Sequence, residues 1–223
     1  MKKDSNKALI FWDNFHKNIK GYGKFRPDPI LSRYLKLIPK GKVLDLGFGD
    51  GRNTLFFAQN GYEVKGVDIS KSAIQSCIKR AKEVKLEIDV KLQDIRNIDI
   101  PENTYSLIIA AMVLQFLNRK ERDIIFEKIN KGLKKDGIVF LRAFSLEDPS
   151  YKRKLLSKQI KMIEPDTFFL EERNMYIHYF SKDEVKSYFN NFQIINFSEI
   201  YSLDLEHGEP HYHGMIIYMG KKI

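Results

Sequence analysis

The sequence predicts an α/β fold: a seven-stranded, mostly parallel sheet with helices on both faces and an antiparallel C-terminal strand. Short apolar segments of strand length alternate with helix-like segments through most of the 223 residues. Such alternation is typical of a parallel sheet that is covered on both faces. Glycines at positions 47, 49 and 51 follow the first apolar segment directly, as in a strand–turn–helix unit. Two β-rich segments around residues 206–210 predict a terminal hairpin, which makes the last strand antiparallel.

The individual elements follow from apolar patterning and from helix start and stop residues. The predicted strands cover residues 43–46, 63–68, 85–93, 106–111, 138–144, 192–205 and 215–219. The predicted helices cover residues 53–60, 71–82 and 119–133, and a fourth starts at Ser181. Residues 146–179 interrupt the alternation, and we expect them to be mostly helical or irregular.

Composition and charge exclude several classes of protein. The single cysteine, Cys77, excludes an internal disulfide and a zinc cluster built on thiolates. No apolar run approaches the roughly 18 residues of a membrane span, and no signal-peptide core follows the N-terminus. We therefore expect a cytoplasmic protein without a membrane partner. The net charge of +9 allows a nucleic-acid partner, but the lysines are scattered, which makes that partner the less favoured one.

The glycine-rich segment at residues 43–51 (VLDLGFGDG) has the layout of a nucleotide-binding loop, in which glycines let a ligand lie against bare backbone. A dinucleotide fingerprint starting at Gly47 requires a third glycine at position 52, where this chain has Arg52. A pyrophosphate also favours positive surroundings, whereas Asp45 and Asp50 flank the loop. These acidic residues suit S-adenosylmethionine (SAM), which carries a sulfonium and an ammonium and has no phosphate.

Two further acidic residues stand at strand ends. Asp68 ends the second predicted strand, about 20 residues beyond the first loop glycine, where a carboxylate can accept hydrogen bonds from both ribose hydroxyls. The alternative role, capping the next helix, can be filled by Ser70. Asp94 ends the third strand and can accept a hydrogen bond from an adenine amino group, although an ordinary turn aspartate would look the same. Ile69 and Ile95 would lie on either side of the adenine ring.

Together, residues 45–51, Asp68 and Asp94 resemble the successive motifs of class I SAM-dependent methyltransferases, over roughly residues 40–145. Residues 51–53 and 61–68 more narrowly resemble the tellurite-resistance-type branch, which acts on small molecules. The resemblance implies a Rossmann-like fold, SAM as cofactor, and a cofactor site with these members: Asp45, Gly47, Phe48, Gly49, Gly51, Asp68, Ile69, Asp94, Ile95 and Ala110. The Asn-Pro-Pro-Tyr motif of DNA amino-methyltransferases does not follow the fourth strand, and Cys77 is misplaced for a cytosine-C5 nucleophile.

We expect one methyltransferase domain over residues 1–223. Within it we expect four parts: an N-terminal cap arm (1–40), a SAM-binding core (41–145), a substrate lid insertion (146–180), and the last helix with the C-terminal hairpin (181–223). The arm carries an aromatic cluster that either covers the cofactor or only docks a helix on the core: Trp12, Phe15, His16, Tyr22 and Phe25. Arg26 is a candidate partner for the cofactor carboxylate.

The remaining candidates are histidines. His178 lies in the lid insertion, and His211 and His213 share one face of the last strand, near His207. Since the preceding strand runs parallel to the others, its terminal turn lies at the carboxyl edge of the sheet, where ligands bind. We therefore name His178, His211 and His213 as candidate substrate residues, with a solvated hairpin tip as the alternative. The sequence favours no metal site, and it identifies no catalytic residue.

The favoured function is SAM-dependent methyl transfer to a small molecule at O, N, S or a chalcogen, by in-line displacement. The alternatives are an RNA or protein methyltransferase, suggested by the charge, and a non-catalytic SAM-binding module. A dinucleotide oxidoreductase is the least favoured. The acceptor and the oligomeric state do not follow from the sequence.

Overall fold

The computed structural model describes residues 7–18, 26–204 and 209–223. Seven strands form one sheet in the order β3-β2-β1-β4-β5-β10-β9. Five of them are parallel: β1 (Lys42–Leu46), β2 (Glu63–Asp68), β3 (Asp89–Leu92), β4 (Tyr105–Ala111) and β5 (Leu133–Phe144). β10 (His211–Lys222) pairs antiparallel with both β5 and β9 (Phe192–Asp204). The predicted fold class is therefore confirmed.

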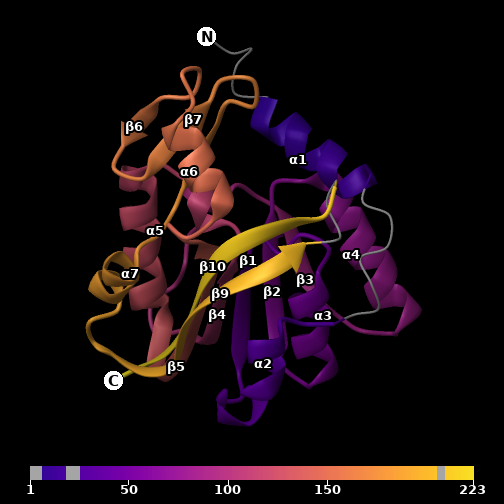
Figure 1. Cartoon of the computed structure of the whole chain (residues 1–223). Helices are drawn as coiled ribbons and strands as arrows, with labels where there is room; N and C mark the ends of the chain where they lie inside the picture. Colours follow the sequence, from indigo (N-terminus) through magenta and orange to yellow (C-terminus); the bar gives the residue numbers. More distant parts are fainter. Residues whose placement is uncertain (1–6, 19–25, 205–208) are drawn as a thin grey trace.

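Helices cover both faces of the sheet because the strand order reverses at β1 and β4. On one face, α2 (Pro29–Arg33) and α3 (Arg52–Gln59) pack their apolar side chains against β1, β2 and β4. α4 (Lys71–Glu83) joins α3 through a cluster that contains Leu55, Cys77 and Ala81. On the other face, α5 (Arg119–Gly132) and α7 (Lys182–Tyr188) bury Ile125, Phe126 and Val185. Figure 1 shows this layered arrangement.

Local sequence signals explain where these helices begin. Ser70 caps α4 by accepting a hydrogen bond from the Ala73 N–H, and Ser181 caps α7 through the Glu184 N–H. Both serines were predicted from the sequence to serve in this role. α5 begins with a capping box in which Asn118 and Glu121 satisfy each other's backbone N–H groups.

The insertion after β5 differs from the sequence prediction. It begins with α6 (Pro149–Leu155) but continues as a three-stranded antiparallel sheet: β6 (Met162–Glu164), β7 (Thr167–Leu170) and β8 (Met175–His178). The expectation of a mostly helical or irregular segment was wrong. Alternate apolar residues of β7 and β8, such as Phe168 and Ile177, are buried in a cluster of their own, which is the period-2 pattern of a half-buried strand. Asn174 takes the left-handed conformation (φ 48°) between the two strands.

The terminal hairpin is present and longer than predicted. β10 spans 12 residues, because it pairs with β9 far beyond the predicted segment 215–219. The hairpin turn, including His207, lies outside the described residues, as do Tyr22 and Phe25. Within the described part of the chain, no helix is long and apolar enough to cross a membrane.

Candidate functional site

The glycine loop joins β1 to α3 in a backbone conformation that favours glycine. Gly47, Gly49 and Gly51 have φ values of 63°, 58° and 80°, in the left-handed region. A Cβ atom on Gly47 would lie 2.5 Å from Cγ2 of Val113, and one on Gly49 would lie 3.2 Å from Cε1 of His16. The loop is therefore bare backbone with side chains of other elements close above it, as the sequence predicted.

A cavity opens beside this loop. Its floor comes from the carboxyl ends of the central strands, including Asp68 after β2, Asp94 and Ile95 after β3, and Met112 after β4. The helix α1 (Lys7–Asn18) covers it with Trp12 and its neighbours, and β8 closes another side with residues 174–176. The cavity lies where strand order reverses, which is where ligands bind in open α/β sheets.

Asp68 is held in place by the loop it faces. Its Oδ2 accepts a hydrogen bond from the Gly49 N–H at 2.9 Å, and its Oδ1 accepts one from the Ser70 N–H at 2.8 Å. The side chain is 6% exposed and lines the cavity. Each carboxylate oxygen has a second lone pair, so Asp68 can accept hydrogen bonds from a ligand while it fixes the loop.

Asp94 is held by an arginine side chain, unlike Asp68, which is held by backbone N–H groups. Its carboxylate accepts hydrogen bonds from Arg96 through Nε, at 2.9 and 3.0 Å, and through the backbone N–H at 2.9 Å. Burial would raise the pKa of Asp94, but the hydrogen bonds from Arg96 outweigh it and leave that pKa below its usual value. Both residues line the main cavity, so Asp94 reaches a ligand as an anion that already has a cationic partner.

The two acidic residues that flank the glycine loop carry less charge toward the cavity than the sequence suggested. Asp50 pairs with Arg80 at 3.0 Å. Burial raises the pKa of Asp45 to about 7, although the hydrogen bond from the Thr54 hydroxyl opposes that shift. A cationic ligand in the main cavity therefore meets Asp68 more directly than it meets Asp45 or Asp50.

Two contacts near the middle of α1 hold this cover over the cavity. Trp12 packs edge-to-face on Phe116, with ring centroids 4.7 Å apart. Asp13 accepts hydrogen bonds from the Ser72 N–H at 2.7 Å and from the Ser70 hydroxyl at 3.1 Å, at the start of α4. Figure 1 shows α1 lying across the molecule between α4 and the β6–β7 region. The aromatic arm therefore covers the cavity, which was one of the two interpretations of the sequence.

The predicted cofactor residues fall into three groups. Gly47, Gly49, Asp68, Ile69, Asp94 and Ile95 line the main cavity. Asp45 and Phe48 line a smaller cavity beside the same loop, which also has Gly47 and Gly49 in its wall. Gly51 and Ala110 line neither: Gly51 packs against Cys77, and Ala110 is fully buried in the core.

The predicted substrate histidines do not line the main cavity. His178 is 2% exposed and is hydrogen-bonded to Thr167 at 2.8 Å and to both oxygens of Glu184, at 2.9 and 3.0 Å. It lies in a separate hollow beside α5 and α7. His211 and His213 lie together on β10, within reach of Asp148 and Asp204. Arg26 is exposed.

Several residues of the site lie outside the set of cofactor residues named from the sequence, although the resemblance placed the segment 110–113 along the cofactor. Met112 lines the main cavity with a left-handed backbone (φ 58°), a conformation that costs free energy and occurs often at functional sites. Its N–H donates to the Arg142 carbonyl at 2.7 Å. Asp13 and Asp148 were missed as well, because their partners are 57 or more residues away in sequence, and no local pattern marks such contacts.

The fold and the loop geometry define a class of protein. Residues 43–137 match the family model described as a methyltransferase domain, in agreement with the sequence resemblance. SAM is the cofactor of this class. The glycine cradle, Asp68 and the apolar Ile69 and Ile95 suit the bare backbone, ribose and adenine contacts that SAM requires.

Individual relatives place the chain more closely. It is 33% identical over 114 residues to a probable SAM-dependent methyltransferase, TehB, from Haemophilus influenzae (51% of this chain, 40% of that protein). It is 32% identical over 146 residues to a carboxy-S-adenosyl-L-methionine synthase from Vibrio vulnificus (62% of this chain). The chain spans 58% of the length of the synthase.

Solved structures agree on the fold. The crystal structure of TehB from Haemophilus influenzae superposes with a TM-score of 0.69 at 22% identity, over 95% of this chain and 66% of that one. A SAM-dependent methyltransferase from Methanosarcina mazei superposes with a TM-score of 0.71 at 21% identity, over 88% and 98% of the two chains. The TehB matches confirm the resemblance to the branch predicted from the sequence.

Proposed function

We propose that this chain transfers the methyl group of SAM to a small-molecule acceptor. The observation that carries the proposal is the covered cavity, in which the glycine loop, Asp68 and Asp94 face a space enclosed by α1 and β8. Small-molecule sites are concave, mostly apolar clefts with a few polar groups, and this cavity has such a lining, with Trp12 and Phe116 beside Asp68. A cavity of this kind suits a small acceptor better than a folded protein or an RNA helix.

The residues of the chain bind, orient and exclude water. When bound, SAM supplies an electrophilic methyl group on a sulfonium. Asp68 and Asp94 anchor the polar parts of the cofactor, and Ile69 and Ile95 contact its flat, apolar part. Trp12 and Phe116 keep water from the reacting atoms. Holding donor and acceptor in line can supply roughly 7–11 kcal/mol of the barrier.

A release assay for S-adenosylhomocysteine tests this proposal. The purified chain is incubated with SAM and a panel of small thiols, phenols and selenium or tellurium oxyanions, with bulk RNA and protein included as alternative acceptors. We expect turnover with at least one small molecule and none with the polymers. Asp68→Asn should abolish most of that turnover, whereas Asp183→Asn, at a carboxylate that is 97% exposed, should retain it. Turnover on RNA or protein alone would overturn the small-molecule proposal. SAM binding without any turnover would indicate a non-catalytic module.

A second candidate comes from the relatives named carboxy-S-adenosyl-L-methionine synthase, which recur at about 27–32% identity. A chain with that activity would modify SAM itself. Mass spectrometry of the nucleoside that copurifies with the chain distinguishes the two candidates. Methyl transfer predicts SAM or S-adenosylhomocysteine, and the second candidate predicts a sulfonium that is heavier by one carboxyl group.

A further inference from the structure

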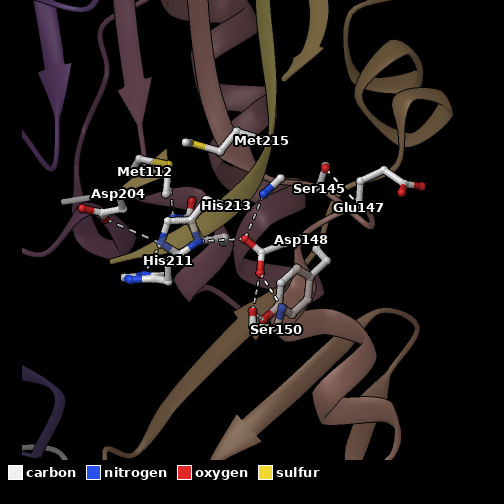
Figure 2. A network of polar contacts seen from close by, with 12 residues as sticks. Met112, Ser145, Glu147, Asp148, Ser150, Asp204, His211, His213 and Met215 are labelled. Atoms are coloured by element: carbon white, nitrogen blue, oxygen red, sulfur yellow. Dashed lines mark hydrogen bonds and ion pairs between the residues drawn. The ribbon is translucent and has the colours of Figure 1, made fainter. Parts of the chain in front are cut away.

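A polar cluster on the terminal hairpin stands apart from the main cavity. His211 and His213 point to the same face of β10 because they are two residues apart, and Asp204 of β9 lies opposite His211 in the strand register. The Nε2 atoms of the two histidines are 2.9 Å apart. Oδ2 of Asp204 is 3.7 Å from Nε2 of His213. Figure 2 shows the two imidazoles and Asp204 converging, with Asp148 on the far side of the His213 ring.

The outer hydrogen bonds fix the proton on each ring. Nδ1 of His211 lies 2.8 Å from the Glu209 carbonyl, which can only accept, so Nδ1 must donate. Nδ1 of His213 lies 2.8 Å from Oδ2 of Asp148. Both oxygens of Asp148 already accept backbone hydrogen bonds, Oδ2 from the Gly214 N–H at 3.2 Å and Oδ1 from the Ser150 N–H at 2.8 Å. Asp148 is therefore an acceptor, and Nδ1 of His213 donates to it.

With Nδ1 protonated on both rings, a neutral imidazole carries its lone pair on Nε2. The two Nε2 lone pairs then face each other at 2.9 Å, with the Asp204 carboxylate beside them. Two lone pairs at this distance repel unless a cation lies between them. The cation is either a proton, shared after one ring is protonated, or a metal ion bound by both rings.

We propose that Asp204, His211 and His213 bind a divalent first-row transition metal ion, with zinc as the reference. Nε2 of each histidine and one oxygen of Asp204 are the ligands. Three observations favour a metal over a proton: the third ligand, the outward hydrogen bonds and the spacing.

The third ligand is an anion that a shared proton would not need. The ligand atoms of all three residues lie within 4.8 Å of one another. Around a tetrahedral zinc ion with bonds of about 2.0–2.1 Å, neighbouring ligand atoms are about 3.3 Å apart. The separations of 2.9 Å between the two Nε2 atoms and 3.7 Å between His213 and Asp204 lie on either side of that value, and side-chain movements that bring Asp204 closer to His211 would complete the geometry.

The surroundings of His213 are typical of a metal ligand. In metal sites, the ring nitrogen that does not bind the ion usually donates to a carboxylate, which fixes the ring and raises its basicity. Asp148 does this here, and it is itself held by the Gly214 N–H at 3.2 Å and the Ser150 N–H at 2.8 Å. Two imidazoles and one carboxylate suit zinc, iron(II) or nickel rather than magnesium or calcium, which prefer oxygen ligands.

The proposed metal site lies at the end of β5 and can hold a further ligand. β5 ends at Phe144, and the ring of Phe144 lies 4.9 Å from that of His213. The site therefore stands at the carboxyl edge of the sheet, on the side of β5 opposite to β4 and the main cavity. Three protein ligands leave at least one coordination position for water or a bound molecule.

The test measures metal binding by the full chain without a histidine tag. After removal of metals with a chelator, calorimetry with Zn²⁺ should give one site per chain, and Co²⁺ should give the intense visible absorption of a four-coordinate ion. His211→Ala, His213→Ala and Asp204→Asn should each weaken Zn²⁺ binding by at least about tenfold. Asp148→Asn should weaken it by about 10- to 100-fold, the usual effect of losing an outer hydrogen bond.

Two controls separate the site from nonspecific binding and from misfolding. Tyr212→Phe changes the residue between the two histidines, on the opposite face of β10, and should leave Zn²⁺ affinity unchanged. The His211→Ala/His213→Ala double variant should keep the parent affinity for SAM, because neither histidine lines the main cavity. Equal Zn²⁺ affinity in the parent and a folded double variant would overturn the proposal. Crystals soaked in Zn²⁺ that show no anomalous peak between the two Nε2 atoms would overturn it independently.

Discussion

Asp68 joins the glycine loop to the cavity, and its two backbone hydrogen bonds to Gly49 and Ser70 explain why a carboxylate is needed at this position. It organises the bare backbone and remains open to a ligand. An asparagine there would keep one oxygen for the Gly49 N–H and lose the charge. Replacing Asp68 by asparagine and by alanine therefore separates its structural role in the loop from its role in ligand binding.

We expect Asp68→Ala to weaken SAM binding by about 1.5–3 kcal/mol, the usual worth of a hydrogen bond to a charged group, or roughly tenfold to hundredfold. α4 should persist because Ser70 caps it. Calorimetry gives the affinity, and circular dichroism checks the fold. Asp68→Asn should lie between the parent and the alanine variant. Unchanged SAM affinity in a folded Asp68→Ala protein would show that Asp68 only fixes the glycine loop and does not bind the cofactor.

Asp45 should make stability depend on pH. Burial raises its pKa to about 7 in the folded chain, against about 3.9 in an unfolded one. Between these values the folded state binds more protons, so this residue's contribution to the free energy of unfolding is fully present below about pH 4 and is lost as the pH rises through about 7. Three pKa units correspond to at most about 4 kcal/mol.

The measurement compares the parent with Asp45→Asn in denaturant unfolding from pH 4.5 to pH 8. Asparagine can still accept the hydrogen bond from Thr54 but cannot ionise, so its stability should fall less across this range than that of the parent. The difference in the free energy of unfolding between the parent and Asp45→Asn should change by a few kcal/mol over this pH range. Parallel curves would show that Asp45 titrates at an ordinary value and is better solvated than its burial implies.

The helix α1 depends on tertiary contacts for its stability and its position. It has no acidic residue in its first turn, and none of its described residues is fully buried. A 12-residue helix is marginal in isolation, so its place over the cavity depends on Trp12 against Phe116 and on the hydrogen bonds of Asp13 to α4.

Asp13→Ala should therefore loosen the cover without unfolding the core. We expect SAM affinity to fall about fivefold to tenfold, because a net hydrogen bond is worth about 1–1.5 kcal/mol. Limited proteolysis should cut residues 7–18 faster than in the parent. Asn14→Ala, at the exposed neighbouring position, is the matched control and should behave like the parent. An Asp13→Ala protein with parental affinity and parental proteolysis would mean that the apolar contacts alone hold α1.

The main cavity should distinguish SAM from the dinucleotide NAD. Arg52 replaces the third glycine of the dinucleotide fingerprint, and Asp68 faces the cavity as an acidic residue. We expect binding of SAM and S-adenosylhomocysteine, with no measurable binding of NAD. Calorimetry with the three ligands under one set of conditions checks this. NAD binding as tight as SAM binding would contradict the cofactor assignment.

The positions of the strands were predictable because they follow from patterns that are local in sequence. Parallel strands such as β1 and β4 are almost fully buried and therefore appear as short, continuous apolar runs. Glycines 47, 49 and 51 are required by the backbone itself. The secondary structure of residues 146–179 was mispredicted because β7 and β8 are four residues long each, too short for their alternation to stand out among the surrounding charges.

The histidine cluster shows what spacing alone could not decide. The sequence placed His211 and His213 on one strand face and favoured a substrate-lining role or a solvated hairpin tip over a metal site. Asp204 joins them only through the hairpin register, and Asp148 reaches His213 from 65 residues away. Neither contact leaves a trace in the sequence near the histidines.

The sequence by itself determined the sheet, the glycine loop and the acidic strand ends, because each depends on the backbone conformation and burial of neighbouring residues. Tertiary structure alone decided which acidic side chains keep their charge. Burial leaves Asp45 with a raised pKa, Arg80 neutralises Asp50, and Asp68 stays at the cavity wall. It also decided that α1 covers the cavity and that four residues from three separate segments meet at the hairpin. Charge and coordination depend on distances in space, and those distances are set only when the chain folds.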